Sequence, residues 1–450
     1  MAAHTLDGAL ACVRFGLGAR PGEIETASRD PRGYLLGQID PLDPPDFPDQ
    51  ALVGSKQAFT IFIDRFAGLR DSDDAAERDD ARDQLRNLHL QELLARVRFG
   101  VETTRPLHER LVRFWSNHFT VAARNPQTTL LAGPFEREAI RPHILGRFRD
   151  LLGAATLHPG MLIYLDNWQS IGPNSLAGRR RDLGLNENLA RELLELHTVS
   201  PAAGYSQNDV TELARALTGH TVGNRRIGSD RLGETLFAPI LHEPGVRDVL
   251  GRRYTGSGAD QVAALLDDLA SHPVTAHRIA SKLAVQFVAD DPPPALVDRL
   301  ETTFIDSDGD LGTVYRVLIE APEVWTDTLA KAKTPDELLT SAGRGLGLPR
   351  ALAAAPRDSF ENLAQLPFRA PSPEGWPDRA DAWITPDSLM KRIQWAAEVA
   401  QRAPGIDARR WLDDVLGPLA GSDTRTAVAR AASSADALAI ALMSPEFQRR

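Results

Sequence analysis

Apolar residues recur at helical spacing over most of this chain, and rarely alternate with polar ones. In segment 273–289, Ile279, Leu283 and Phe287 stand four residues apart, which places them on one face of a helix. The charge-dense segment 55–101 is also helical in its pattern. Strands do not alternate with helices in the way that a parallel sheet requires, so the pattern predicts a mainly α fold.

Proline marks several of the predicted helix starts. Its missing N–H would have no partner in a first helical turn, so the residue is tolerated there. Pro142, Pro159, Pro273 and the Pro-Pro-Pro run at 292–294 stand at such places. Further helices are predicted over 105–122, 388–402 and 424–443.

Two stretches break the helical pattern. Residues 223–256 are rich in glycine and hold short apolar pieces, which predicts a small β-hairpin. Residues 366–387 are rich in proline and tryptophan and are too apolar for a free linker. We therefore expect that this second stretch packs on the body of the protein.

Composition narrows the class of protein. The 450 residues include 51 basic and 61 acidic side chains, and the net charge of −10 disfavours a nucleic-acid-binding protein. Cys12 is the only cysteine, so the chain can form no internal disulfide and no Cys-rich metal site.

The start of the sequence and its apolar runs suggest a location. No basic stretch precedes the first apolar segment, which is not the pattern of an export leader. No apolar run approaches the roughly 20 residues that span a bilayer. We expect a cytoplasmic globular protein without a membrane span, and a periplasmic or exported one if a leader has been removed.

Common catalytic motifs are missing. The sequence has no P-loop, no H-E-x-x-H and no G-x-S-x-G. The Gly256-Ser257-Gly258 string is interpreted as a turn before a helix that begins near Asp260. Residues 306–310 start like a calcium loop, but Leu311 stands where such a loop needs glycine, so we expect an aspartate-rich helix cap.

Residues 186–198 form the most polar helical string. At about 100° per residue, one arc of roughly 140° is acidic with a single arginine, and the opposite arc is rich in leucine. An exposed ladder of i, i+4 ion pairs explains the polar arc, and periodicity alone favours that interpretation. The alternative is a cleft whose carboxylates act as acids, bases or metal ligands. The polar arc consists of Glu187, Asn188, Arg191, Glu192 and Glu195.

Histidines in this part of the chain admit two interpretations. His197 lies among leucines, which is typical of a core histidine, and its spacing from Glu192 and Glu195 does not fit a ferritin-like di-iron motif. The alternative is that histidines and carboxylates of separate segments converge on a divalent metal. The other polar residues of this region are Asn117, His118, Glu136, Arg141, Asp166, Asn167 and His242.

The polar strings resemble a known bacterial family. The strings are FWSNHFT (114–120), YLDN (164–167), NENLARELLELHT (186–198), YSQNDVTELARALTGHT (205–221) and HEPG (242–245). They are similar, in order and over nearly the whole chain, to the "domain of unknown function 1800" family. His220 stands where the family usually has tryptophan, and the family's usual export leader is not seen.

The resemblance implies one large helical domain, residues 1–450, and no established reaction. Within it we distinguish N-terminal helices (1–100), a core of polar motifs (101–250) and C-terminal helices (251–450). Members are often encoded beside a protein that looks like a sulfatase or phosphatase, so such a partner is expected. The alternative to an enzyme is accordingly a non-catalytic binding or maturation partner of that protein, or a structural scaffold.

We predict a polar cleft of a metal-assisted or carboxylate-based enzyme, a hydrolase or oxidase acting on a glycan or a peptide-like substrate. The cofactor is open, with a divalent metal as one choice. The candidate catalytic residues are Glu187, Glu192, Glu195 and Asp166; the candidate substrate-binding residues are Asn117, Arg141, Asn167, Asn186, Asn188 and Arg191; the candidate metal ligands are His118, His197 and His242.

Overall fold

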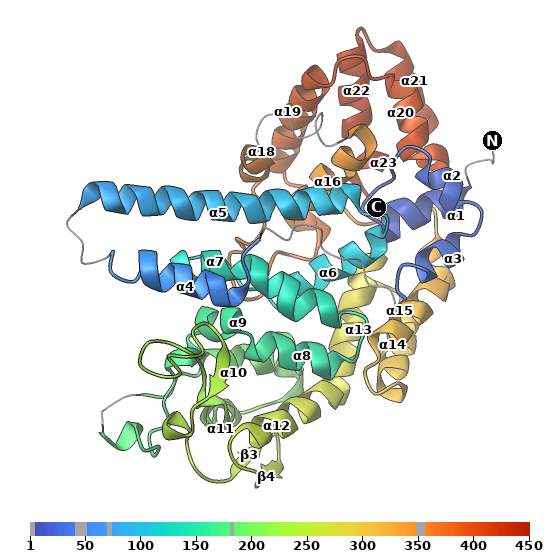
Figure 1. Ribbon diagram of the computed structural model, residues 1–450. Coiled ribbons are helices and arrows are strands. Elements are labelled where there is room, and N and C mark those ends of the chain that lie inside the picture. Colours follow the sequence, from blue (N-terminus) through green and yellow to red (C-terminus); the bar gives the residue numbers. More distant parts are fainter. Residues whose placement is uncertain (1–4, 41–51, 70–73, 181–183, 348–355) are drawn as a thin grey trace.

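The computed structural model describes residues 5–40, 52–69, 74–180, 184–347 and 356–450. The chain is mainly helical (Figure 1), which confirms the predicted fold class. The α-helices before the first strand are α1 (Leu6–Leu10), α2 (Glu23–Ala27), α3 (Pro31–Leu36), α4 (Ser55–Arg65), α5 (Ala75–Glu102), α6 (Pro106–His118), α7 (Pro126–Phe135), α8 (Phe148–Leu157), α9 (Pro159–Tyr164), α10 (Asn188–Glu192) and α11 (Gln207–Leu217). Those after the last strand are α12 (Ala259–Ser271), α13 (Pro273–Phe287), α14 (Pro294–Asp306), α15 (Leu311–Glu320), α16 (Pro335–Leu346), α18 (Pro356–Asn362), α19 (Pro386–Arg402), α20 (Ala408–Val415), α21 (Ser422–Arg430), α22 (Ser434–Met443) and α23 (Pro445–Gln448).

Local capping explains where many helices begin. Asp310 accepts a hydrogen bond from the N–H of Thr313 at 2.7 Å and so caps α15, as the sequence predicts. Thr334 and Glu337 form a capping box at the start of α16. The predicted helix 424–443 is wrong in one respect, because Ser433 caps a new helix and divides the segment into α21 and α22.

Within the described residues, three helical turns are π-helical, a wider winding that often occurs at functional sites. They are η1 (Ala11–Phe15), η2 (Glu136–Ile140) and η6 (Leu193–His197). They directly continue α1, α7 and α10. The short 3₁₀ turns are η3 (Arg141–His143), η4 (Asn167–Gln169), η5 (Gly178–Arg180), η7 (Pro201–Ala203), η8 (Pro239–Leu241), η9 (Pro322–Trp325), η10 (Ala380–Ala382) and η11 (Gly417–Leu419).

Two small antiparallel sheets lie in and beside the glycine-rich stretch 223–256. Strand β1 (His220–Val222) pairs with β2 (Thr235–Phe237), and β3 (Arg247–Val249) pairs with β4 (Arg252–Tyr254). The β3–β4 turn, Leu250-Gly251, has φ values of 49° and 74°, as a tight two-residue hairpin requires. The predicted hairpin is confirmed.

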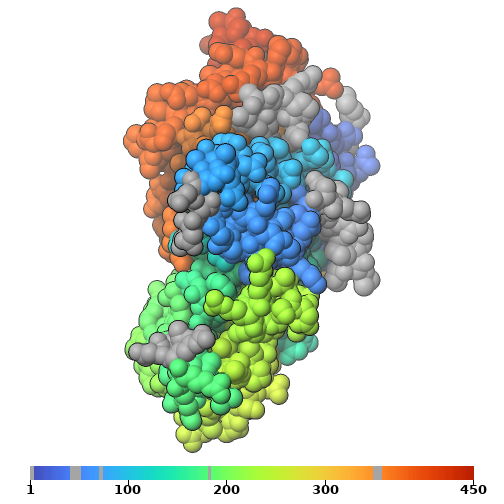
Figure 2. Space-filling model, turned by 60° about the vertical axis from the view of Figure 1, so that its left-hand side comes forward, coloured from blue at the N-terminus to red at the C-terminus, as the bar shows by residue number. Residues whose placement is uncertain are grey.

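The helices are arranged along an elongated body. In Figure 1, α19–α22 form one end, while α11, α12 and the β3–β4 hairpin form the other. Helices α4 and α5 lie side by side and project from the middle, where Arg65 Nε is 3.2 Å from Gln84 Oε1. Figure 2 shows the segment around residues 223–234 against α4, and Lys56 Nζ lies 2.9 Å from Glu234 Oε1 there.

One cluster of buried apolar side chains extends from Ala9 to Phe447. Around Trp115 the aromatic rings of Phe119 and Phe148 lie 5.9 and 5.6 Å from its ring centroid. Trp115 Nε1 also donates a hydrogen bond to the Tyr315 hydroxyl at 2.5 Å. This packing fixes the end of α6, where the polar string 116–120 begins.

Among the helices of the described ranges, none is both long and apolar enough to cross a membrane. The division into one domain with three subregions stays a prediction.

Candidate functional site

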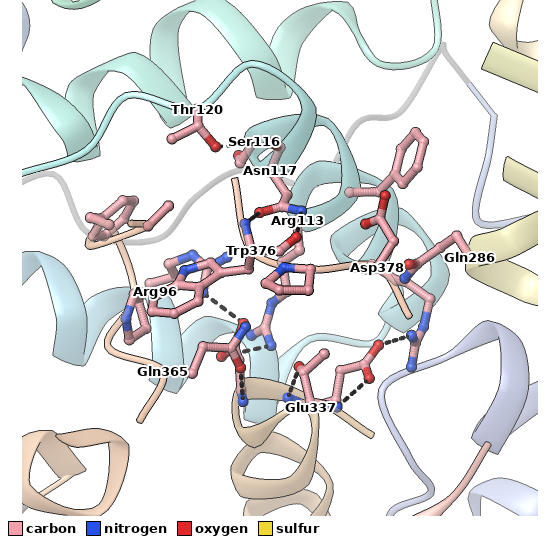
Figure 3. Close-up of a pocket in the computed structure, with 18 of the residues that line it drawn as sticks. Arg96, Arg113, Ser116, Asn117, Thr120, Gln286, Glu337, Gln365, Trp376 and Asp378 are labelled. Atoms are coloured by element: carbon pink, nitrogen blue, oxygen red, sulfur yellow. Dashed lines mark hydrogen bonds and ion pairs between the residues drawn. The ribbon is translucent and has the colours of Figure 1, made fainter. Parts of the chain in front are cut away.

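Two polar pockets share one wall. Trp376, Pro377 and Asp378 line both of them. The first pocket has a volume of about 120 Å³ and is walled by α5, α6, α13, the start of α16 and segment 365–378 (Figure 3). The second has a volume of about 200 Å³ and lies between the end of α6, α13 and segment 371–378. The proline- and tryptophan-rich stretch therefore packs on the body, as predicted, and it separates two hollows.

Asn117 holds the shared wall in place. Its Nδ2 donates to the carbonyl oxygen of Trp376 at 2.9 Å, and its Oδ1 accepts from the N–H of Trp376 at 2.7 Å. Gly375 has a φ of +91°, and a Cβ there would lie 2.5 Å from the carbonyl oxygen of Asn117. The predicted substrate-binding Asn117 thus lies at the site, where it positions Trp376.

Buried ion pairs dominate the first pocket. Arg96 lies 3.0 Å from Glu136 and 2.9 Å from Asp336, and Glu337 pairs with Arg110 and with Arg450. Burial would raise the pKa of Glu337, but Arg450 and Arg110 outweigh it and lower the pKa to about 2. These carboxylates therefore stay ionised at neutral pH.

Arg141 belongs to the same buried network and lines neither pocket. Its guanidinium bonds to Glu109 at 2.7 Å and lies over the ring of Phe99 at 4.9 Å. The predicted role of Arg141 in substrate binding stays a prediction, with the guanidinium engaged inside the protein.

His118 and His197 lie together beside the second pocket. Their ring centroids are 6.1 Å apart, and His118 Nε2 is 3.1 Å from the carbonyl oxygen of His197. A carbonyl can only accept, so Nε2 carries the proton and Nδ1 keeps a lone pair. Burial, aided by Lys282, holds the pKa of His118 well below its usual range, so the ring is neutral. Burial likewise lowers the pKa of His197 to about 3.

The three candidate metal ligands do not come together. His242 lies elsewhere, with Nδ1 2.8 Å from the carbonyl oxygen of Thr218 and its ring 5.2 Å from that of Phe237. Across the described part of the chain, no group of three His, Cys, Asp or Glu side chains is placed to hold a metal ion. The geometry gives the metal prediction no support.

The two halves of the polar helix 186–198 have different surroundings. Glu187 faces α11, where its carboxylate accepts hydrogen bonds from Thr211 Oγ1 and Gln207 Nε2, both at 2.7 Å. Arg191 joins this ladder, 3.2 Å from Glu187. Asn186 accepts from the N–H of Asn188 at 2.9 Å and thereby shapes the helix start. For this half the ladder interpretation describes the geometry.

Glu192 and Glu195, in contrast, are half-buried and interact electrostatically with residues that line the second pocket. Burial raises the pKa of Glu192, and the carboxylates of Glu195 and Glu374 raise it further. Glu374 lines that pocket, as does Arg278, whose guanidinium interacts with Glu374 and Glu195. Crowded carboxylates cannot all ionise freely, so one of them keeps its proton to higher pH.

Asp166 and Asn167 lie outside both pockets. Asp166 is exposed with a left-handed φ of 59°. Asn167 is buried, and its Nδ2 donates to the carbonyl oxygens of His220 at 3.0 Å and Leu217 at 3.3 Å. This amide joins η4 to the end of α11, and the site roles assigned to both residues stay predictions.

Most residues that line the two pockets were not among the predicted site residues. Trp376 lies in a stretch that was expected only to pack, and segment 273–289, which holds Arg278 and Lys282, was described only by its apolar face. The signal available for Trp376 was an aromatic residue in an apolar, proline-rich stretch between helices.

A family model covers residues 11–449 of the chain. Its description is "Protein of unknown function (DUF1800)".

The chain belongs to the DUF1800 family.

A comparison with curated proteins gives no match, and a comparison with solved structures gives none. In this DUF1800 protein, the polar strings 114–120 and 186–198 contribute Asn117, His118 and Leu196 to the walls of the two pockets, and Glu192 interacts electrostatically with Glu374 of the second. String 164–167 stands apart from them. Family membership brings no reaction with it, so the chemistry must be argued from the pockets.

Proposed function

We propose that the two pockets bind a polyhydroxylated ligand, part of a glycan, with Trp376 as the surface between two of its sugar units. The observation that carries this proposal is the position of Trp376, which lines both pockets and whose backbone is fixed by two hydrogen bonds to Asn117. An indole ring offers an apolar face and a polar edge, which suits the mixed surface of a sugar. Fixing the backbone that carries the ring before binding lowers the entropy cost of binding.

Polar side chains around Trp376 are of the types that bind hydroxyl groups. Gln365, Ser116 and Thr120 line the first pocket, and Arg278 and Glu374 line the second. Pockets that combine an apolar surface with a few placed polar groups are typical ligand sites. A peptide-like ligand would use the same groups, so the binding experiment includes one.

For catalysis, we propose Glu192 as a general acid in hydrolysis of the bound glycan. Its raised pKa keeps a larger protonated fraction than a free glutamate has, which favours protonation of a leaving-group oxygen. Glu195 or Glu374 would supply the second carboxyl group that glycoside hydrolysis requires. Glu187, held by Thr211 and Gln207, has no part in this step.

Binding is tested by calorimetric titration of the purified chain with cellotetraose, chitotetraose, tetragalacturonate and a tetrapeptide. We expect saturable binding of at least one oligosaccharide, and at least a tenfold loss of affinity in Trp376→Ala. Trp168→Ala is the matched control, because Trp168 is also half-buried but lines neither pocket. Binding of the tetrapeptide alone, or equal losses in both variants, would contradict the proposal.

The catalytic step is tested by release of reducing ends from the oligosaccharide that binds. Glu192→Gln should lower the rate by roughly 100-fold or more, while affinity for the substrate is kept. Glu187→Gln is the matched control on the same helix and should keep the rate. If the wild type binds the oligosaccharide but does not cleave it, the protein binds glycans without hydrolysing them and the catalytic proposal is wrong. Equal losses of rate in the two variants would exclude Glu192 as the acid.

The sulfatase- or phosphatase-like partner expected from the family resemblance stays a prediction. Co-expression with such a protein, followed by purification of one of the two, is its direct test.

A further inference from the structure

We infer that the first pocket binds an oxyanion group, a carboxylate, sulfate or phosphate, through the guanidinium of Arg110. This inference goes beyond glycan binding, because the anion is expected to bind whether or not a sugar is present.

Every carboxylate in the wall of the first pocket already has a cationic partner. Glu136 and Asp336 pair with Arg96 at 3.0 and 2.9 Å, and Asp378 pairs with Lys282 at 2.5 Å. Glu337 pairs with both Arg110 and Arg450. These four are the carboxylates that line the pocket. Because each is paired with a cation, it repels an incoming anion less than an unpaired carboxylate would.

Arg110 retains an unused donor. Its Nε donates to the carbonyl oxygen of Gly16 at 2.7 Å, and its Nη1 bonds to Glu337. Nη2 is buried and has no hydrogen-bond partner within the described ranges, and the whole residue is only 2% exposed. Buried donors in folded proteins are nearly always satisfied, so each exception asks for an explanation. A ligand oxygen in the pocket would supply the missing acceptor.

The surroundings of Arg110 carry an excess of positive charge. Burial lowers the pKa of Arg110 to about 9, and the charges of Arg450 and Arg113 add to this, although Glu337 opposes them. Behind the pocket wall, Lys333 is buried with a pKa lowered to about 7 by burial and by neighbouring arginines. Arg110 and Arg450 share the single carboxylate of Glu337, and such an excess of cations in a poorly solvated place favours a bound anion, which would be held by charge-assisted hydrogen bonds.

The pocket has room for such a group. Its volume of about 120 Å³ compares with the roughly 10–15 Å³ that one water needs on the same kind of measure. The N-terminal turn of α16 also borders it through Thr334 and Asp336. A carboxylate, sulfate or phosphate group therefore fits in the pocket that Arg110 and Trp376 both line.

The test uses the full chain at pH 7 and constant ionic strength, with sodium sulfate, phosphate or acetate replacing sodium chloride. Titration calorimetry and thermal unfolding are the measurements. We expect one-to-one saturable binding of at least one anion and a rise in Tm beyond that in chloride. Sulfate or phosphate binding without acetate binding would assign a tetrahedral group, and the converse would assign a carboxylate.

Arg110→Gln should lower the affinity for the anion at least tenfold. Arg299→Gln, which removes an exposed arginine paired with Glu323 at 2.8 Å, should leave that affinity unchanged. If Arg110→Gln does not fold, Ala370→Leu decides instead, because Ala370 lines the pocket and the larger side chain fills it without changing charge. The inference is overturned if no anion binds beyond chloride, or if the folded variant binds as the wild type does. Oligosaccharide binding measured in chloride reports separately on the proposed function.

Discussion

The two pockets on either side of Trp376 neutralise their charges differently. In the first, carboxylates such as Glu337 are buried against arginines, and their pKa values fall. Glu192, which interacts with Glu374 in the wall of the second, is half-buried, and burial and the neighbouring carboxylates raise its pKa. The first arrangement fixes the structure, because separating the partners leaves a charge in a poorly solvated place. The second keeps a proton available for chemistry.

The largest expected effect is on the first pocket. Glu337→Gln leaves Arg110 and Arg450 without their carboxylate, which should lower the free energy of unfolding by about 3–5 kcal/mol. Urea unfolding measures it. The control is Glu323→Gln at an exposed ion pair, where a loss of at most about 1 kcal/mol is expected. Equal losses would mean that the buried pair is no more important than a surface one.

The same carboxylate predicts a pH dependence. The pKa of Glu337 is about 2 in the folded protein and near 4.5 when unperturbed. Its pairing therefore stabilises the fold fully above about pH 4.5, and this stability is lost as the pH falls from there towards 2. Wild type and Glu337→Gln should converge in stability over that window. A constant difference down to pH 2.5 would show that charge is not the cause.

A smaller effect is expected at the wall between the pockets. Asn117→Ala removes two hydrogen bonds to the backbone of Trp376, which should cost about 1–3 kcal/mol in unfolding free energy. It should also weaken oligosaccharide binding, because Trp376 is no longer held. The loss in binding free energy should exceed the loss in unfolding free energy. Asn188→Ala, at an exposed position, is the control and should change neither quantity. Unchanged binding in Asn117→Ala would show that Asn117 does not position Trp376 for the ligand.

The smallest effects compare two glutamates of one helix. The pKa of Glu192 is raised by burial, so its ionised form opposes folding, and this cost grows as the pH rises through 4.5 to the folded pKa. The pKa of Glu187 is lowered, first by the hydrogen bond from Thr211, so its ionised form favours folding, and this benefit is lost as the pH falls. At pH 7, Glu192→Gln should be neutral or slightly stabilising and Glu187→Gln slightly destabilising. Each change should stay below about 1 kcal/mol, since solvent screens both groups. Calorimetric unfolding measures both variants. Changes of the same sign in their unfolding free energies would contradict the difference between Glu192 and Glu187.

Local features of the fold were predictable and the site largely was not. Asp310 and the proline starts act within one helical turn, so the sequence alone indicates them. Arg96 and Asp336 are 240 residues apart, and no local pattern brings them together. The acidic arc was assigned at 100° per residue, but Leu193–His197 winds as a π-turn. That turn shifts the phase of the helix, so Glu195 no longer continues the ladder of Glu187 and Arg191.

The central claim is that Trp376 lies at a ligand site. It is tested most directly by fluorine NMR of the chain labelled with 5-fluorotryptophan, with the Trp376 resonance assigned by its loss in Trp376→Phe. During titration with the oligosaccharide that calorimetry identifies, we expect the Trp376 resonance to shift saturably while that of Trp168 stays in place. A saturable shift elsewhere with an unchanged Trp376 resonance would contradict the account.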